Sequence, residues 1–166
     1  ATADESTRIV YLANPNNPTG TWFGTAALDD FLSQLRRDIL VIVDEAYNEL
    51  TDNPEKNSMI DLVREGRSVA IARTFSKIYG LAGMRIGYLI APPAITAEVN
   101  RFGLGDYAMN QAGVAAAIAS YDDLEFVEYS KARIIEGREM VLAAVRQVGL
   151  EALPSGTGIV ADDLLA

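Results

Sequence analysis

Short apolar runs alternate with amphipathic segments along this chain of 166 residues. Four runs predict buried strands: RIVYL at 8–12, ILVIVDEAY at 39–47, SVAIARTFS at 68–76 and RIGYLIAPP at 85–93. The second run is continuous, rich in β-branched residues and ends in charge. This pattern is typical of a central parallel strand that is buried on both faces.

Between and after these runs, apolar residues recur at helical spacing. The predicted helices lie at 24–38, 58–66, 94–102, 110–121 and 122–149. The last has acidic residues in its first turn and Gly149 at its end, which are ordinary helix start and stop signals. Strands that alternate with helices predict an α/β sheet with helices on both of its faces.

Polar residues follow three of the predicted strands. They lie at Asn14–Gly20, Asp44–Tyr47 and Thr74–Lys77. Because ligands of such sheets bind at the carboxyl ends of the strands, these segments are the first candidates for a site. Solvated loops with no function would show the same polarity, so the pattern alone leaves both interpretations open.

Composition excludes several classes of function. The formal net charge is -9, so a nucleic-acid backbone would be repelled. No apolar run approaches the roughly 20 residues that cross a bilayer, and no signal peptide is visible. We therefore expect neither a nucleic-acid nor a membrane partner, and a cytoplasmic location. Apolar residues make up 49% of the chain, which is ordinary for one folded domain.

The chain contains neither cysteine nor histidine. Disulfides, thiolate catalysis, Ser-His-Asp triads and the usual zinc sites are therefore excluded, and we expect no metal. Chemistry must rely on Lys, Tyr, Asp, Glu or Arg side chains, or on a bound cofactor.

Three motifs in order, NPNNPTG (14–20), DEAY (44–47) and TFSKIYGLAGMRIGY (74–88), resemble the fold type I pyridoxal-phosphate aminotransferases. The histidinol-phosphate aminotransferase-like group is the most similar branch, and the resemblance runs from Arg8 to Pro154. It implies a three-layer α/β/α domain with a mainly parallel sheet, incomplete at both ends. Residues 1–154 would be part of the large, cofactor-binding domain and 155–166 the start of a truncated or divergent small domain.

Lys77 is the first candidate catalytic residue. Low-polarity surroundings depress the pKa of a lysine, and a neutral amine can form a Schiff base with an aldehyde. The resemblance implies that Lys77 holds pyridoxal 5′-phosphate in this way and then moves a proton on the substrate. Asp44 emerges from a dry strand, where an unpaired charge is costly; the resemblance supplies the pyridine nitrogen as its partner, and makes Glu45 structural.

The remaining candidates also come from the resemblance. Tyr47 and Asn17 would hydrogen-bond the phenolic oxygen of the cofactor, with a cis bond at Asn17–Pro18. Thr74, Ser76 and Arg85 would hold its phosphate, since guanidinium groups meet phosphate oxygens bidentately. From the residues alone, Lys77 could also be a surface lysine, Asp44 a helix cap and Arg85 an ion-pair partner.

The implied activity is transfer of an amino group between an amino acid, of histidinol phosphate or aromatic type, and a 2-oxo acid, in a homodimer. Two alternatives stay open: a decarboxylase or lyase of the threonine-phosphate decarboxylase type, and a non-catalytic remnant module. Family segments expected before Ala1 and after Ala166 would carry ring stacking and substrate carboxylate binding. The 166 residues by themselves are therefore expected to bind the cofactor weakly and to be inactive.

Overall fold

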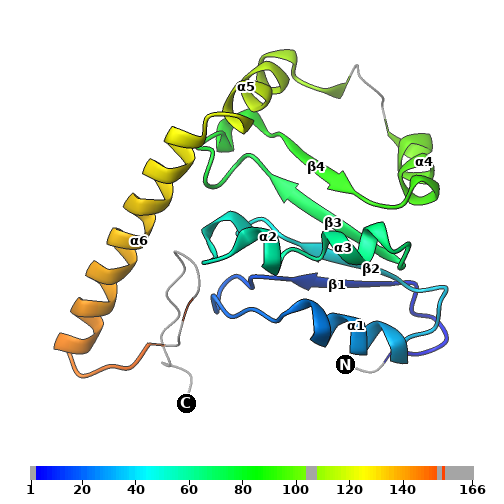
Figure 1. Cartoon of the computed structure of the whole chain (residues 1–166), viewed down its shortest axis with the longest axis horizontal. Coiled ribbons are helices and arrows are strands. Elements are labelled where there is room, and N and C mark those ends of the chain that lie inside the picture. The colour runs from blue at the N-terminus through cyan, green and yellow to red at the C-terminus, as the bar shows by residue number, and fades with distance from the viewer. Residues whose placement is uncertain (1–2, 104–107, 153–154, 156–166) are drawn as a thin grey trace.

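The computed structural model describes residues 3–103, 108–152 and 155 of the chain (Figure 1). A 4-stranded sheet in the order β1-β2-β3-β4 forms its centre. The strands are β1 (Ile9–Ala13), β2 (Leu40–Asp44), β3 (Val69–Thr74) and β4 (Gly87–Ile90). The first three are parallel to one another, and β4 is antiparallel to β3. The predicted α/β class with a mainly parallel sheet is confirmed.

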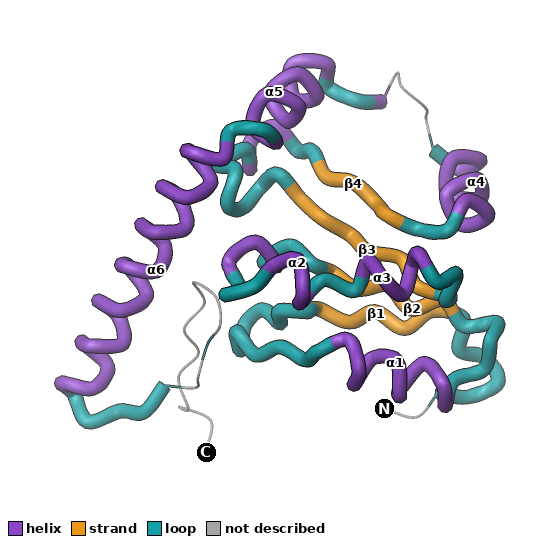
Figure 2. Tube along the Cα trace, in the orientation of Figure 1, coloured by secondary structure: helices purple, strands orange, loops and turns teal. Residues whose placement is uncertain are grey.

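Within the described part of the chain, five helices lie at the ranges that the apolar spacing predicts, and one short helix, Pro54–Asn57, was not predicted (Figure 2). Their bounds are α1 (Thr25–Gln34), α2 (Pro54–Asn57), α3 (Ile60–Arg64), α4 (Pro93–Phe102), α5 (Gln111–Tyr121) and α6 (Leu124–Gln147), with short 3-10 turns η1 (Asn48–Leu50) and η2 (Ala82–Met84). The side chain of Asp123 caps α6, and Gly149 has the left-handed φ that ends it. Among the described residues, no helix has the length and apolar composition that crossing a membrane requires.

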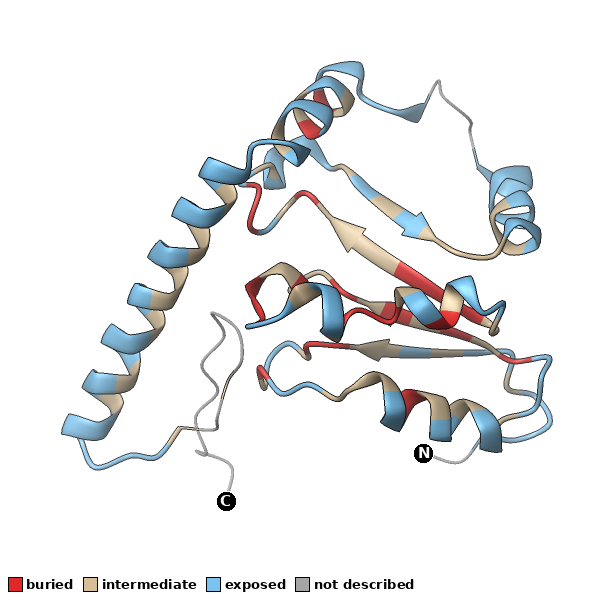
Figure 3. Ribbon diagram, in the orientation of Figure 1, coloured by how far each residue is buried: buried red, intermediate tan, exposed pale blue. Residues whose placement is uncertain are grey.

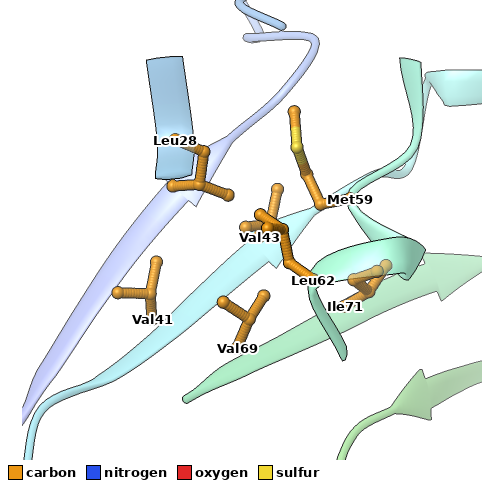
Figure 4. Packing of buried hydrophobic residues seen from close by; sticks show 7 residues of the cluster. All are labelled: Leu28, Val41, Val43, Met59, Leu62, Val69 and Ile71. Carbon is orange, nitrogen blue, oxygen red and sulfur yellow. The ribbon is translucent and has the colours of Figure 1, made fainter. Parts of the chain in front are cut away.

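One face of the sheet carries the main hydrophobic core. Val41 and Val43 of β2 are fully buried against Leu28 of α1 and Leu62 of α3 (Figure 4). Alternate residues of a strand point to opposite faces, so β2 presents this valine pair to the helices. This packing therefore fixes the position and orientation of the strands that carry the candidate site.

The opposite face is less covered by the described residues. On β1, Ile9 and Tyr11 point to this face and are 56% and 60% exposed. Figure 3 shows that buried residues are concentrated in β2 and β3, whereas β1 contains only exposed and intermediate residues. Helices on both faces were predicted; over β1, the described residues supply them on one face.

A second cluster packs α5 and α6 against the end of the sheet. Phe75 and Tyr79, which follow β3, pack in a tilted arrangement with ring centroids 4.9 Å apart, and both belong to a cluster with Ala117 of α5. From there α6 extends along one side of the molecule, as Figure 1 shows. The predicted small-domain start at 155–166 lies outside the described residues, apart from Ser155.

Candidate active site

The candidate site lies where the carboxyl ends of three strands meet the start of β4. Asp44, the last residue of β2, pairs with Ala13 of β1 and Ala72 of β3. Because β4 is antiparallel, it begins at this same edge, and Gly87 pairs with Thr74. A side chain there meets close packing: a Cβ added to Gly87 would lie 2.7 Å from the backbone oxygen of Arg73. The sheet thus brings all three predicted polar segments, and Arg85 before β4, to one edge.

The loop after β1 is held from within by a buried asparagine. Asn14 is 2% exposed, and its side chain exchanges two hydrogen bonds of 2.9 Å with the backbone of Phe23. The Asn14–Pro15 and Asn17–Pro18 peptide bonds are both cis, the second as predicted. This anchoring leaves the side chain of Asn17 free to face the loop after β2.

Tyr47 connects two other candidates. Its hydroxyl accepts a hydrogen bond of 2.9 Å from the side-chain amide of Asn17. The ammonium nitrogen of Lys77 lies 5.0 Å from the centroid of the Tyr47 ring, within the range of a cation–π contact. Residues from three separate loops are therefore neighbours in the folded chain.

Lys77 itself is exposed, so the dry surroundings predicted from its sequence neighbours are not formed by the described residues. The physical reason is local. The neighbouring Phe75 and Ile78 turn into the second cluster, whereas Lys77 begins a turn closed by a hydrogen bond from Gly80 N to its carbonyl. The turn directs the lysine away from the core.

Three side chains predicted to bind phosphate also lie together. The backbone N–H of Ser76 donates to the hydroxyl of Thr74 over 3.0 Å, and Arg85 Nη1 lies 3.4 Å from the hydroxyl of Ser76. Arg85 has a φ of 55°, a left-handed conformation that is unusual for a residue with a side chain. A second bond, to the carbonyl of Ala82 at 2.8 Å, holds its guanidinium.

Asp44 keeps its carboxylate at the strand end with one hydrogen bond to each oxygen. Oδ1 accepts from the backbone N–H of Ala46 at 3.0 Å, and Oδ2 accepts from the hydroxyl of Tyr11. Sequence reasoning missed Tyr11. The available signal was alternation, because Tyr11 lies two residues before Ala13, which is the partner of Asp44 on the neighbouring strand.

The predicted structural role of Glu45 agrees with its contacts. It is fully buried, and its carboxylate accepts from the backbone N–H of Met59 at 2.6 Å, the hydroxyl of Ser58 and the guanidinium of Arg73 at 2.7 Å. Burial lowers the pKa of Arg73, but the hydrogen bonds and the charge of Glu45 outweigh this effect, so the net change in the pKa is upward. Sequence reasoning did not identify Ser58 or Arg73, which reach Glu45 only in the folded sheet.

The chemistry of this donor set fits pyridoxal phosphate. Within the part of the chain that the structure describes, neither Lys77 nor Arg85 forms an ion pair with a carboxylate, although acidic residues outnumber basic ones by 23 to 14. A guanidinium with no carboxylate partner beside two hydroxyls can receive a phosphate, and an amine with no carboxylate partner can react with the aldehyde. Asp44, on the adjacent strand, supplies a carboxylate of the kind that a pyridinium nitrogen requires.

Comparison with known proteins agrees with this chemistry. The family model for aminotransferase class I and II matches residues 1–165. Histidinol-phosphate aminotransferase 2 of Pseudomonas fluorescens (strain Pf0-1) is 38% identical over 164 residues, which is 99% of this chain and 44% of that protein. The solved histidinol-phosphate aminotransferase of Sinorhizobium meliloti, in complex with pyridoxal-5′-phosphate, has a TM-score of 0.88 and 35% identity over 98% of this chain.

A structural relative of different named activity is also similar. The L-threonine-O-3-phosphate decarboxylase of Porphyromonas gingivalis has a TM-score of 0.70 and 25% identity over 93% of this chain and 49% of its own. The chain thus spans less than half the length of these relatives. Since the family model matches nearly every residue, the chain belongs to the aminotransferase class I and II family.

Proposed function

We propose that the protein carrying this chain is a pyridoxal-phosphate-dependent aminotransferase. Its amino donor would be an amino acid of histidinol phosphate or aromatic type, and its acceptor a 2-oxo acid. One observation carries the proposal: an amine, a carboxylate and a guanidinium beside two hydroxyls gather at one sheet edge. Relatives named histidinol-phosphate aminotransferase support the choice of donor.

The residues divide the work by their chemistry. Bound pyridoxal phosphate supplies an aldehyde carbon that combines with amines, and a ring that accepts the electron pair left when a bond to the substrate α-carbon breaks. Lys77 would hold this carbon and later carry the α-proton on Nζ. The carboxylate of Asp44 would keep the pyridine nitrogen protonated. Tyr47, oriented by Asn17, would donate a hydrogen bond to the phenolic oxygen.

The phosphate would be bound by Thr74, Ser76 and Arg85. Their proximity supports this assignment, because Ser76 contacts both of the other residues. Its backbone N–H donates to the Thr74 hydroxyl over 3.0 Å, and its own hydroxyl lies 3.4 Å from Arg85 Nη1. Charge-assisted hydrogen bonds from arginine are stronger than neutral ones, so Arg85 would contribute the largest share of this grip.

The wider assignments belong to the same proposal. The amino acid and 2-oxo acid would bind beside Lys77, and the whole protein would be a homodimer in the cytoplasm. The large-domain assignment of residues 1–154 is supported by a family match that runs from residue 1 to 165. The net charge of -9 would repel a nucleic-acid backbone, and the proposal includes neither a nucleic acid nor a membrane as partner.

The test is covalent trapping in the whole protein that carries this chain. Borohydride reduction after incubation with pyridoxal phosphate should add one pyridoxyl group to Lys77, located by peptide mass mapping. Lys77→Arg keeps the positive charge but cannot form a Schiff base, so the label should be absent. Its turnover should fall about 10²–10⁴-fold, which is the usual contribution of a general base. Lys56→Arg, at an exposed position on α2, is the matched control and should change neither. A label on another lysine, or no label, would contradict the proposal.

Product analysis separates the alternatives. With histidinol phosphate and 2-oxoglutarate, an aminotransferase forms glutamate without releasing CO₂. A decarboxylase, which the threonine-phosphate decarboxylase relative keeps in view, would release CO₂ from an amino acid substrate. A non-catalytic module would do neither.

A further inference from the structure

Asp44 has a neighbour across the sheet that no motif includes. Tyr11 pairs with Ile42 in the parallel ladder between β1 and β2, and Ala13 pairs with Asp44. Because side chains alternate along a strand, Tyr11 and Asp44 point to the same face, opposite the valines of the main core. The long tyrosine side chain reaches two positions forward along the neighbouring strand.

The contact fixes both oxygens of one carboxylate. Tyr11 OH donates to Asp44 Oδ2, while the backbone N–H of Ala46 donates to Oδ1 over 3.0 Å. The terminal torsion of an aspartate is otherwise broad, so two donors on different elements restrict its rotation. Each oxygen keeps a further lone pair, so the carboxylate can still accept a third hydrogen bond.

The phenol also remains a donor at any pH at which such an enzyme works. Its hydrogen bond to Asp44, together with partial burial and the charge of the same carboxylate, raises the pKa of Tyr11 to about 12. The hydroxyl is therefore protonated throughout the neutral range. A role that depended on ionised Tyr11 is excluded by the same contact.

We propose that Tyr11 is a positioning residue that orients the Asp44 carboxylate toward the pyridine nitrogen of the cofactor. The inference rests on the proposed function and goes beyond it, because Tyr11 belongs to none of the three motifs. Side chains that bind a ligand are themselves oriented by neighbouring hydrogen bonds, and the loss of such a bond lowers the affinity for the ligand.

The test compares Tyr11→Phe with wild type in the whole protein that carries this chain. Phenylalanine keeps the ring and loses only the hydroxyl. We expect its affinity for pyridoxal phosphate to fall about tenfold, as when a hydrogen bond that orients a ligand-binding side chain is lost. The pH dependence of the absorbance of the bound cofactor should also shift. Tyr129→Phe is the matched control, because Tyr129 of α6 is similarly exposed, at 63% against 60%; it should change neither readout.

A double-mutant cycle separates positioning from a merely structural effect. In an Asp44→Asn background, Tyr11→Phe should weaken cofactor binding by less than twofold, since the carboxylate that it orients is gone. An equal loss in both backgrounds would show a structural role and overturn the inference. So would wild-type affinity and an unchanged absorbance profile in Tyr11→Phe alone.

Failure of the proposed function has a different signature. If wild-type protein does not bind pyridoxal phosphate at all, the cofactor assignment fails and the role of Tyr11 fails with it. If wild type binds and Tyr11→Phe binds equally well, only the positioning role is overturned.

Discussion

At the residue scale, the candidate site is supported by a buried charged network around Glu45, which has no proposed catalytic role. Glu45 directly follows Asp44, and its side chain points into the core side of the sheet, where Arg73 and Ser58 meet it. The two adjacent carboxylates therefore have different environments: one buried and paired, the other at the partly exposed edge. Alternation along one strand separates the structural acid from the candidate catalytic one.

Removing the partner of Glu45 should be costly. We expect Arg73→Met to destabilise the protein by about 3–5 kcal/mol, because it leaves a buried charge without compensation. Arg64→Met is the matched control: its ion pair with Asp61 is exposed, with side chains 70% and 69% accessible, and should contribute about 0–1 kcal/mol. Urea unfolding of both variants measures the difference. Equal midpoints would contradict a stabilising role for the buried pair.

At the element scale, the antiparallel β4 decides whether Arg85 reaches the site. The strand must approach β3 closely at its first residue, where Gly87 faces the backbone oxygen of Arg73. Arg85, two residues earlier, then turns in a left-handed conformation toward Ser76. A parallel fourth strand would begin at the other edge of the sheet and carry Arg85 away.

A methyl group at Gly87 should disturb this arrangement. Its Cβ would lie 2.7 Å from a backbone oxygen that cannot move without the strand, so we expect Gly87→Ala to cost about 1–3 kcal/mol. Gly137 of α6 has open space around it, and Gly137→Ala should stabilise by about 0.5–1 kcal/mol through helix propensity. Opposite signs in thermal or denaturant unfolding are the expected result. A neutral Gly87→Ala would show that β3 and β4 separate easily.

At the scale of the whole molecule, aromatic packing couples the site to the long helix. The segment that carries Lys77 continues into Ile78 and Tyr79, which pack in the second cluster with Ala117 of α5. Val127 and Ile134 of α6 pack against the same cluster, so the turn that begins at Lys77 and the long helix α6 are held by the same set of contacts. Loosening the cluster is expected to loosen both.

Alkaline pH should weaken this aromatic packing. Burial, reinforced by the charge of Glu49, raises the pKa of Tyr79 to about 12 in the folded chain, against about 10 when unfolded. The folded state then retains the proton more tightly, so the stability contribution is complete below pH 10 and declines as the pH rises toward 12. Urea midpoints measured between pH 8 and 12 should fall less steeply in Tyr79→Phe than in wild type. If the urea midpoints of the two proteins fell equally steeply with pH, the raised pKa of Tyr79 would be contradicted.

The sequence by itself determined the strands, the helices and the family. Local signals suffice for these: β-branched runs mark buried strands, spacing marks helices, and the three motifs occur in a fixed order. It also determined the candidate residues around Lys77, because each lies inside a motif.

The tertiary structure alone decided which of these residues meet. Arg73 and Ser58 reach Glu45, and Tyr11 reaches Asp44, through sheet pairing between segments that lie 13 to 33 positions apart along the chain. The exposure of Lys77 and the reversed direction of β4 were likewise not readable from local pattern. Periodicity shows on which face of its own helix or strand a residue lies. Which residues of other helices and strands it contacts depends on strand order, register and packing.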